Sequence, residues 1–351
     1  MVEISVLMYT FNSEIFIKDS LDSLLNQTFS DFEIFCINDE STDNSMDILN
    51  DYSNKKNINV FSIKHAGFSN VINQFLDKVH GKYLYIMTPE VILEENALEI
   101  LYNKSEELKT DFVILNSDYF DEVNNKHFDK NDFFMKNMDP SLSEGFKYED
   151  IKDLVFNMDT SLSNILFRID FIKENEISCP ETVSYGEDVF FYNSLLSAHK
   201  IFFFKDKLIT HRIYSTSLTK RNDSHLLDSI PIWNMILDVF DEKNELKNFK
   251  HSIYEHKMNS IIGEYYKIKE EYKEEYFCLL KQDFINILND EENINDFIEN
   301  ISSHNRKFFE QVLISENCYE LSLLTKTYYD MLEYYKLIEE EKYLQPIADE
   351  K

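Results

Sequence analysis

The residues of this 351-residue chain best placed to do chemistry are polar side chains that follow short apolar runs. Asp39 follows one such run, and Thr88, Pro89 and Glu90 follow another. Carboxylate oxygens suit hard divalent cations such as Mn²⁺ or Mg²⁺. If the runs are strands of a parallel sheet, ligands bind beyond their carboxyl ends, so these residues point to one cleft.

Several other chemistries are excluded by the sequence. The chain has only five glycines, and none are spaced as G-x-G-x-x-G or G-x-x-x-x-G-K-[ST], so a Rossmann fingerprint and a P-loop are absent. Its four cysteines form no C-x-x-C, and its nine histidines form no H-E-x-x-H, so no zinc site has a local signature. Reduced thiols in a cytoplasmic protein are the expectation.

Charge and hydropathy limit the classes of partner that the chain is expected to bind. With 35 basic and 65 acidic residues the formal net charge is -30, which disfavours nucleic acid as a partner. A hydrophobic content of 43% with 15% aromatics predicts a large folded core. The longest stretch without charged side chains, His65 to Leu76, falls short of the roughly 18 residues that cross a bilayer. We therefore expect no transmembrane anchor, and the N-terminal residues show no secretory signal.

Apolar runs alternate with helical periodicity over the first third of the chain. Strands are predicted at Ile4–Met8, Phe32–Ile37, Ile58–Ile63, Tyr83–Met87 and Phe112–Leu115. Helices are predicted between them at Ser13–Asn26, Ser45–Tyr52, Ser69–Val79 and Glu95–Leu108. This order predicts an α/β fold with a mostly parallel sheet and flanking helices.

The rest of the chain is less regular at first and then helical. Asp118 to Tyr148 is interpreted as a hairpin or a loop, followed by a strand and helix within Ser163–Glu174. A helix at Glu187–Ala198 and a strand at Ile201–Lys205 come next, and from Ser224 to Tyr343 helical spacing continues.

Three stretches together resemble the family-2 glycosyltransferases with the GT-A fold. The first is Ile4 to Asn12 followed by Leu21 to Thr28, and the second is Glu33 to Ser45, with its Asn-Asp-Glu-Ser-Thr-Asp. The third comprises Asn164–Arg168, Gly186–Phe191, His211–Arg212 and Ser217–Thr219. The resemblance implies a nucleotide-sugar-binding half at 1–117, an acceptor-side half at 118–222, and a helical C-terminal region at 223–351 outside the family.

The resemblance assigns roles to five positions. Phe11 would stack on a nucleobase, and Asp39 would accept from the ring N–H of uracil in a UDP-sugar donor. Thr88 would lie on the ribose side, Arg212 would pair with a phosphate, and Asp188 would be the base that deprotonates an acceptor hydroxyl in an inverting transfer. The acceptor would be a surface glycan or a lipid-linked sugar. Peripheral membrane or protein contacts would go through the helical region.

Each of these residues also has a plain structural interpretation. Phe11 would be a core residue at a strand end, and Asp39 a turn or cap residue. Asp188 would complement the dipole at a helix N-terminus, with Glu187 its neighbour on another face. Arg212 would form an ordinary surface ion pair. His211, where the family often has Tyr, is interpreted as a satisfied loop histidine.

The chain departs from the family pattern on the donor side. Where the family places Asp-x-Asp, the chain has Thr88-Pro-Glu, so only Glu90 stands at the metal-ligand position. We expect binding of Mn²⁺ or Mg²⁺ to be weak or absent. Glu40 replaces a turn glycine, and Ile72 replaces an arginine near the donor. If Glu90 is no ligand, it is a helix-entry residue.

Two functions follow from this pattern. The first is an inverting glycosyltransferase that moves a hexose-type sugar from a nucleotide diphosphate to a surface-glycan or lipid-linked acceptor. The alternative is a non-catalytic relative that keeps the fold as a binding or assembly module, because a shared fold alone does not establish function.

Overall fold

The computed structural model describes residues 2–55, 57–130, 132–183, 186–214, 223–290 and 294–326. The chain forms two compact units. The first comprises Met1–Arg221 and Pro231–Phe249, and the second comprises Asn222–Ile230 and Lys250–Lys351. The functional division expected at 117/118 and 222/223 stays a prediction.

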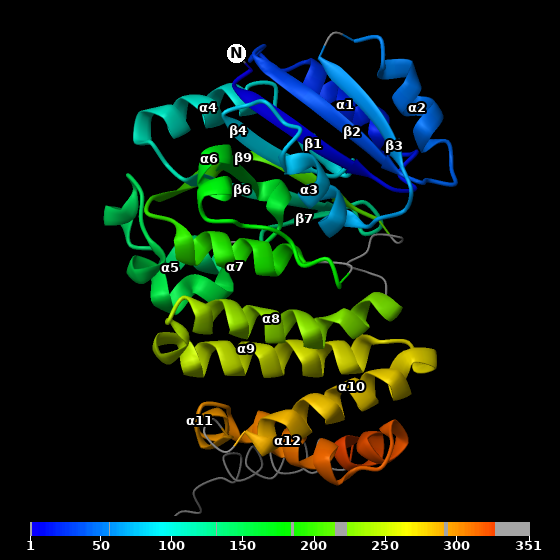
Figure 1. Cartoon of the computed structure of the whole chain (residues 1–351), viewed down its shortest axis with the longest axis vertical. Helices are drawn as coiled ribbons and strands as arrows, with labels where there is room; N and C mark the ends of the chain where they lie inside the picture. Colours follow the sequence, from blue (N-terminus) through cyan, green and yellow to red (C-terminus); the bar gives the residue numbers. More distant parts are fainter. Residues whose placement is uncertain are drawn as a thin grey trace, which may run out of the picture. The chain divides into compact units, whose positions relative to one another are not determined.

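A nine-stranded sheet organises the described part of the first unit (Figure 1). Its strands follow the order β3-β2-β1-β4-β8-β6-β9-β5, and β7 pairs with β6. Their bounds are β1 Ile4–Thr10, β2 Phe32–Asp39, β3 Ile58–Ile63, β4 Tyr83–Met87, β5 Val91–Leu93, β6 Phe112–Asp121, β7 Lys126–Phe128, β8 Ile165–Arg168 and β9 Ile201–Ile213.

The four strands β1 to β4 form the parallel half of the sheet, as the alternating pattern predicts. β1 lies between β2 and β4 and runs parallel to both, and β3 runs parallel to β2. Four helices connect or flank these strands: α1 Ile17–Leu25, α2 Ser45–Tyr52, α3 Phe68–Leu76 and α4 Ala97–Leu108. Their apolar side chains, such as Leu21, Leu49 and Leu101, are fully buried and cover the sheet. The carboxyl ends of β1 and β2 therefore meet at one edge.

The other half of the sheet mixes directions, which the sequence did not show in full. β8 is antiparallel to β4 and β6, β9 is parallel to β6, and β5 is antiparallel to β9. The hairpin expected after Asp118 is present as β6 and β7. β5 was not predicted, because a strand of three residues is too short to show the alternation of apolar and polar residues by which strands are recognised.

The strand predicted to end at Lys205 continues to Ile213, so that prediction was too short. Its pairing with β6 shifts register beside Asn116, where a bulge takes up extra residues. The exposed segment 205–207 interrupts the apolar run at that bulge, which explains why the pattern ended early.

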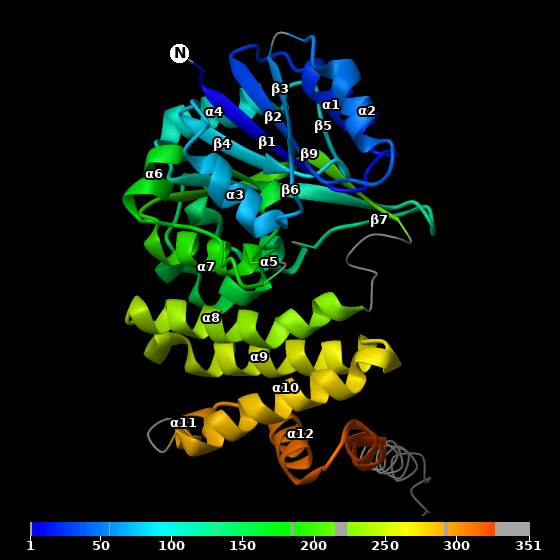
Figure 2. The same ribbon diagram turned by 45° about the vertical axis from the view of Figure 1, so that its right-hand side comes forward.

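Short helices complete the first unit. They are α5 Asp132–Asn137, η1 Pro140–Leu142, η2 Tyr148–Asn157, η3 Leu162–Asn164, α6 Ile169–Glu174 and α7 Glu187–Ser197. α7 confirms the predicted helix, one residue shorter at its end. From α8 (Ser229–Glu242), Phe240 stacks on Phe156 of η2 with ring centroids 5.7 Å apart, and it also contacts Phe249. Figure 2 shows the same elements from a second side.

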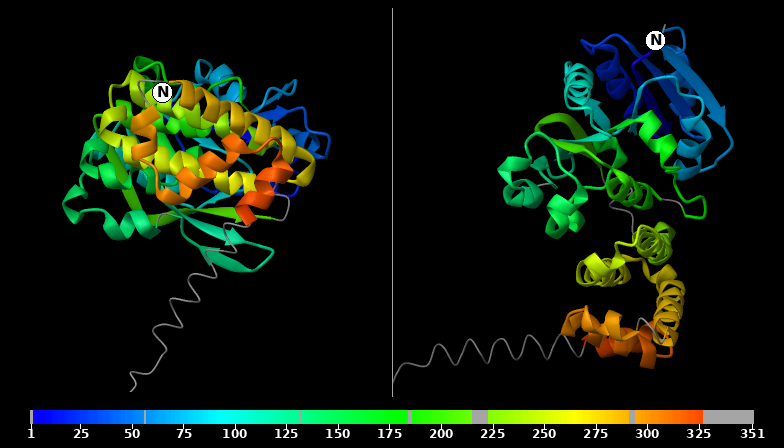
Figure 3. Two further views of the ribbon diagram at one scale, coloured as in Figure 1. Left: turned by 90° about the horizontal axis from the view of Figure 1, so that it is seen from below. Right: turned by 60° about the vertical axis from the view of Figure 1, so that its left-hand side comes forward.

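The second unit is helical in all its described elements. Its helices are η5 Ser224–Asp228, most of α9 Leu246–Lys267, α10 Glu270–Asn289, α11 Ile294–Glu299 and α12 Ser303–Ile314, and residues 318–326 are helical too. α10 contacts both α11 and α12 (Figure 3). A buried ion pair joins Lys257 Nζ to Asp283 Oδ2 at 2.8 Å. The helical region is thus confirmed as far as residue 326, while its predicted extension to Tyr343 lies outside the described residues. Among the described helices none is long and apolar enough to span a membrane.

Candidate active site

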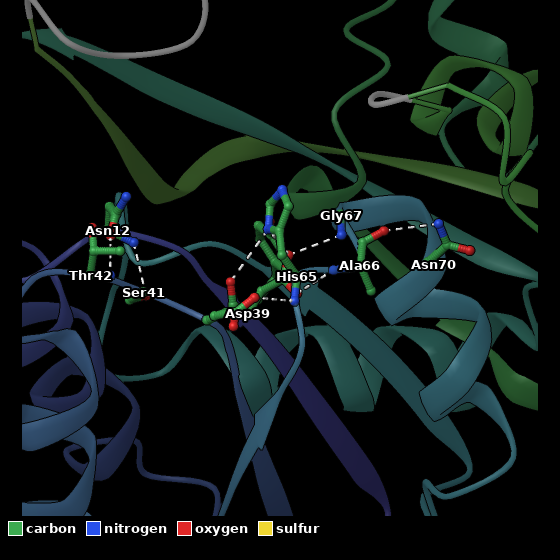
Figure 4. A network of polar contacts seen from close by, with 10 residues as sticks. Asn12, Asp39, Ser41, Thr42, His65, Ala66, Gly67 and Asn70 are labelled. Carbon is green, nitrogen blue, oxygen red and sulfur yellow. Dashed lines mark hydrogen bonds and ion pairs between the residues drawn. The ribbon is translucent and has the colours of Figure 1, made fainter.

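Asp39 is the centre of a hydrogen-bond cluster at the end of β2 (Figure 4). Its side chain is fully buried, and its carboxylate accepts from the backbone N–H groups of Ala66 (2.7 Å) and Gly67 (2.9 Å). The hydroxyl of Tyr9 donates to Oδ2 at 3.0 Å, and Nδ1 of His65 lies 3.0 Å from the same oxygen. Three hydrogen-bond donors and the His65 ring therefore surround the carboxylate, which offsets the cost of burying its charge.

Phe11 joins this cluster through His65, a residue that the sequence analysis did not single out. Phe11 follows β1, is partly exposed, and stacks on the His65 ring with centroids 4.8 Å apart and planes inclined by 35°. Phe11 and Asp39 thus contact the same side chain at the ends of adjacent strands. Their roles toward a nucleobase stay predictions.

The loops after β1 and β2 are held together by side-chain hydrogen bonds. Ser41 Oγ accepts from the backbone N–H of Asn12, and Asn12 Oδ1 accepts from that of Thr42 at 2.8 Å. Glu40, which replaces the family's turn glycine, has a left-handed φ of 58°. Its Oε2 accepts from the backbone N–H of His65 at 3.1 Å. The turn therefore keeps the conformation that favours glycine although the residue is Glu.

The segment after β4 forms a turn before β5. The backbone N–H of Val91 donates to the Thr88 carbonyl at 3.1 Å, and that of Arg212 donates to the Glu90 carbonyl at 3.0 Å. Glu90 therefore precedes a strand, so the alternative expectation of a helix-entry residue was wrong. The described residues contain no group of three or more His, Cys, Asp or Glu side chains arranged to hold a metal ion. Protein side chains alone therefore do not form a metal site here, and Glu90 offers a single carboxylate.

Arg212 is buried and makes its contacts inside the protein. Nη1 donates to Asp19 Oδ2 at 2.8 Å, and Nη2 donates to the carbonyls of Phe16 and Pro89, each at 3.2 Å. With 7% of its side chain exposed, this is not the ordinary surface ion pair of the alternative interpretation. The guanidinium joins α1 to the turn after β4, so a phosphate would have to compete with Asp19.

Glu187 and Asp188 begin α7, as predicted, and are partly exposed. Thr160 Oγ1 donates to Asp188 Oδ1. Burial raises the pKa of Asp188, the Thr160 hydrogen bond lowers it, and the nearby Asp159 raises it again. Burial, then the charges of Asp188 and Asp159, raise the pKa of Glu187 to about 8. Near pH 7 Glu187 is therefore largely protonated.

Asp159 is a second buried carboxylate centre that the sequence analysis missed. Its Oδ2 accepts from the Tyr119 hydroxyl and from Asn164 Nδ2 (2.8 Å), and its Oδ1 accepts from the backbone N–H of Ser161 at 3.2 Å. Lys130 Nζ lies 3.9 Å from Oδ1 and 4.2 Å from the centre of the Tyr119 ring. Lys130 therefore provides positive charge beside a group of carboxylates.

His211 lies in β9 and not in a loop, which corrects the sequence interpretation. Its ring stacks on Tyr119 with centroids 4.6 Å apart and planes inclined by 10°, and its Nε2 lies 2.7 Å from Asn164 Oδ1. The interpretation of a satisfied side chain is confirmed by these contacts. Burial lowers the pKa of His211 to about 4, so the ring is neutral near pH 7.

A short chain of contacts joins the Asp39 cluster to the acids of α7. Gly67 donates to Asp39, and two residues later Ser69 Oγ accepts from the backbone N–H of Gly186 at 3.0 Å. A Cβ on Gly186 would stand 2.5 Å from ring carbons of Pro180, so a larger residue does not fit there. The two clusters are thus parts of one packed region.

Asn73, in α3, holds this helix to the segment before α7. The Asn73 side chain both accepts from and donates to the backbone of Cys179, at 2.9 and 2.8 Å. Ile72, at the family's arginine position, is fully buried in the core. A cation at that position would therefore lie in an apolar environment.

Some site residues carry no sequence signal of their own. His65, Lys130 and Asp159 are single polar residues in loops, and only contacts between distant segments bring them to the site. The expected landmark Ser217–Thr219 lies outside the described residues, as does Ser184 before α7.

Comparisons with known proteins agree with this geometry. Residues 5–175 match the family model described as Glycosyl transferase family 2. The poly(ribitol-phosphate) beta-glucosyltransferase of Bacillus spizizenii is 32% identical over 206 residues, covering 57% of this chain and 30% of that protein. The putative glycosyltransferase EpsH of Bacillus subtilis is 25% identical over 260 residues, covering 71% of this chain and 72% of that protein. The match thus spans about 30% of the length of the first relative.

Solved structures extend the likeness beyond the family match. The crystal structure of S. aureus TarS 1-349 in complex with UDP-GlcNAc aligns with a TM-score of 0.71 at 18% identity, covering 93% of this chain and 92% of that one. At this identity the likeness shows the fold alone, and it includes the helices after β9. The predicted fold class is thereby confirmed as a GT-A-type α/β sheet followed by a helical region, and residues 5–175 match the model of glycosyl transferase family 2.

Proposed function

We propose that the chain is an inverting glycosyltransferase that moves a sugar from a UDP-sugar to a surface-glycan or lipid-linked acceptor. The observation that carries this proposal is the packed connection between two clusters, one around Asp39 and one around Asp188, through Gly67, Ser69 and Gly186. The family match over residues 5–175, which ends before α7, supports the donor end and the first part of the acceptor side. So do the relatives named poly(ribitol-phosphate) beta-glucosyltransferase and putative glycosyltransferase EpsH.

The Asp39 cluster is the proposed donor end. A uracil ring would stack on the partly exposed Phe11, and its ring N–H would donate to the Asp39 carboxylate. TarS was crystallised with UDP and with UDP-GlcNAc, which supports a uridine donor by analogy of fold. Thr88 follows β4 and would face the ribose side.

The Asp188 cluster is the proposed acceptor end. Asp188 takes the proton of an acceptor hydroxyl, whose oxygen forms a bond to the anomeric carbon. On the opposite face the bond from that carbon to the diphosphate oxygen breaks, and UDP leaves with the electron pair. Burial raises the pKa of Asp188, which strengthens it as a base. Thr160 holds its Oδ1 in place.

Glu187 supports this assignment by holding a proton itself. Burial and the neighbouring carboxylates raise its pKa to about 8, so near pH 7 it is largely neutral. A neutral Glu187 adds no repulsion beside an ionised Asp188. We therefore assign the role of base to Asp188. Glu187, in its protonated form, keeps a second negative charge away from it.

The metal role in this proposal belongs to Glu90. Thr88-Pro-Glu is interpreted as a degenerate Asp-x-Asp, with Glu90 the remaining carboxylate. Mn²⁺ or Mg²⁺ held there would draw its other ligands from diphosphate oxygens and water, and would offset the charge of the leaving group. Arg212 would reach a phosphate only by releasing Asp19.

Location and partners follow from the same proposal. Four free cysteines are consistent with the cytoplasmic location predicted from the sequence, where nucleotide sugars would be the donors. The helical region would provide contacts to a membrane surface or another protein.

A transfer assay tests the function. Radiolabelled UDP-glucose and UDP-GlcNAc are offered with poly(ribitol phosphate) and with lipid-linked sugars, using the wild type and Asp188→Asn. We expect sugar incorporation by the wild type and a loss of about 100-fold or more in the variant, which keeps the shape but cannot take the proton. Equal incorporation by both proteins would remove Asp188 from the mechanism.

A further inference from the structure

We propose that His65 is a built-in competitor of the nucleobase, and that its imidazole must leave Phe11 and Asp39 before a donor nucleotide can bind. The inference rests on the proposed donor site. It concerns one side chain, and it makes His65 a determinant of donor affinity in this chain.

The His65 ring already makes both contacts that the base would need. It is a planar ring packed against Phe11, with centroids 4.8 Å apart and planes tilted by 35°. Its Nδ1 lies 3.0 Å from Asp39 Oδ2, the distance of a hydrogen bond. A pyrimidine ring with its N–H on the same carboxylate and its face on the same phenyl ring would use the same two partners.

Oδ2 of Asp39 has little capacity left for a further donor. Oδ2 has about two lone-pair sites and already accepts from Tyr9 and Gly67, with His65 Nδ1 3.0 Å away, whereas Oδ1, among the described residues, accepts from Ala66 alone. A base N–H directed at Oδ2 would therefore have to replace one of the contacts of that oxygen.

His65 is the donor that can leave most easily. Ala66 and Gly67 donate through the backbone, and Tyr9 packs edge-on against Phe68 with centroids 5.4 Å apart. The His65 side chain, in contrast, is 56% exposed, while that of Asp39 is fully buried. Figure 4 shows the imidazole above Asp39, next to the backbone of Ala66 and Gly67.

The main chain of His65 can stay in place while the ring turns away. Its backbone N–H donates to Glu40 Oε2 at 3.1 Å, a contact that does not involve the ring. Rotation about the side-chain torsions is fast for exposed residues. While the ring lies over Phe11 and Asp39, a nucleotide does not bind. The apparent affinity for a nucleotide is then the intrinsic affinity multiplied by the fraction of molecules in which the ring has turned away.

Calorimetric titration of UDP into the full chain tests this inference. Variants are His65→Ala, which removes the ring, and His65→Phe, which can still stack on Phe11 but cannot donate to Asp39. We expect His65→Ala to bind UDP about 3- to 10-fold more tightly than the wild type, and His65→Phe to bind more weakly than His65→Ala. Thermal unfolding of each variant shows that the comparison is made between folded proteins.

The outcomes separate this inference from the function on which it rests. Weaker UDP binding by His65→Ala would overturn the inference, because the ring would then contribute to nucleotide binding. Unchanged binding would overturn it too, because the ring and the base would then not compete for the same place. A His65→Phe variant that binds as tightly as His65→Ala would also contradict it. Phe11→Ala is the matched control, and it should weaken UDP binding in either case. If neither the wild type nor any variant binds UDP, the donor site itself is wrong.

Discussion

The two ends of the candidate site hold their carboxylates in opposite ways. At the donor end Asp39 accepts from three hydrogen-bond donors, two of them from the backbone, and the His65 ring lies 3.0 Å away. At the acceptor end the charge of Asp159 raises the pKa of both Glu187 and Asp188, and Lys130 is the cation beside Asp159. The difference separates two tasks: a carboxylate supplied with donors is suited to holding a ligand, whereas a crowded group of acids is suited to taking up a proton.

The largest effect should come from removing the centre of the acceptor end. Asp159→Ala leaves the Tyr119 hydroxyl and Asn164 Nδ2 without their acceptor in a buried setting. We expect the free energy of unfolding to fall by about 3 kcal/mol. Urea unfolding measures it, with the exposed Asp153→Ala on the neighbouring η2 as control, for which about 0.5 kcal/mol or less is expected. Equal losses in the two variants would show that the Asp159 cluster is not a centre of stability.

The next largest effect is a change of protein stability with pH, caused by Glu187 at the acceptor end. The pKa of Glu187 is about 8 in the folded chain against an ordinary value of 4.5, so folding takes up a proton between these values. The stability contributed by protonated Glu187 is therefore present at pH 4.5 and is lost as the pH rises toward 8. Glu187→Gln should flatten the fall of the thermal midpoint over this range.

Exposed Glu181→Gln, in the loop before α7, serves as the control for that experiment. Its midpoint should follow the wild-type curve from pH 5 to pH 8. A Glu187→Gln curve parallel to the wild type would mean that Glu187 ionises normally, and the contrast between the two ends would lose its main support.

A smaller effect is expected for the one carboxylate near the proposed metal position. If Glu90 holds a cation against the diphosphate, Mn²⁺ should strengthen UDP binding, and Glu90→Gln should weaken that metal-dependent binding about 10-fold, or about 1.4 kcal/mol. Calorimetry with and without Mn²⁺ measures it, and exposed Glu95→Gln should behave as the wild type. Equal affinities for the Glu90 variant and the wild type would remove the metal role.

The smallest effect concerns the donor loop. Glu40 has a φ of 58°, which costs a residue with a Cβ about 1 kcal/mol or more relative to glycine. Glu40→Gly should therefore raise the free energy of unfolding by about 0.5 kcal/mol, after loss of the hydrogen bond to the His65 backbone. Glu40→Ala keeps the strain and loses the bond, so it should be less stable than the wild type. If glycine is the less stable of the two variants, the turn is not strained.

The sequence predicted the parallel half of the fold better than the site. β1, β2 and β4 appeared as apolar runs because both faces of these strands are covered, and the acids of α7 appeared at a helix start. The surface ion pair considered for Arg212 was wrong, because this residue is buried and its partner Asp19 lies 193 positions away, a pairing that no local pattern reveals. His65 and Asp159 were missed for the same reason, since burial and contacts across strands make them important.

The most direct test of the central claim, that the two ends divide holding from proton transfer, is the UDP affinity of Phe11→Ala and Asp188→Asn measured side by side. Loss of stacking should weaken UDP binding by about 10-fold in Phe11→Ala, since base stacking on an aromatic ring contributes roughly 1 to 3 kcal/mol. Asp188→Asn should bind UDP within about twofold of the wild type while losing transfer. A large loss of UDP affinity in Asp188→Asn, or none in Phe11→Ala, would contradict this division.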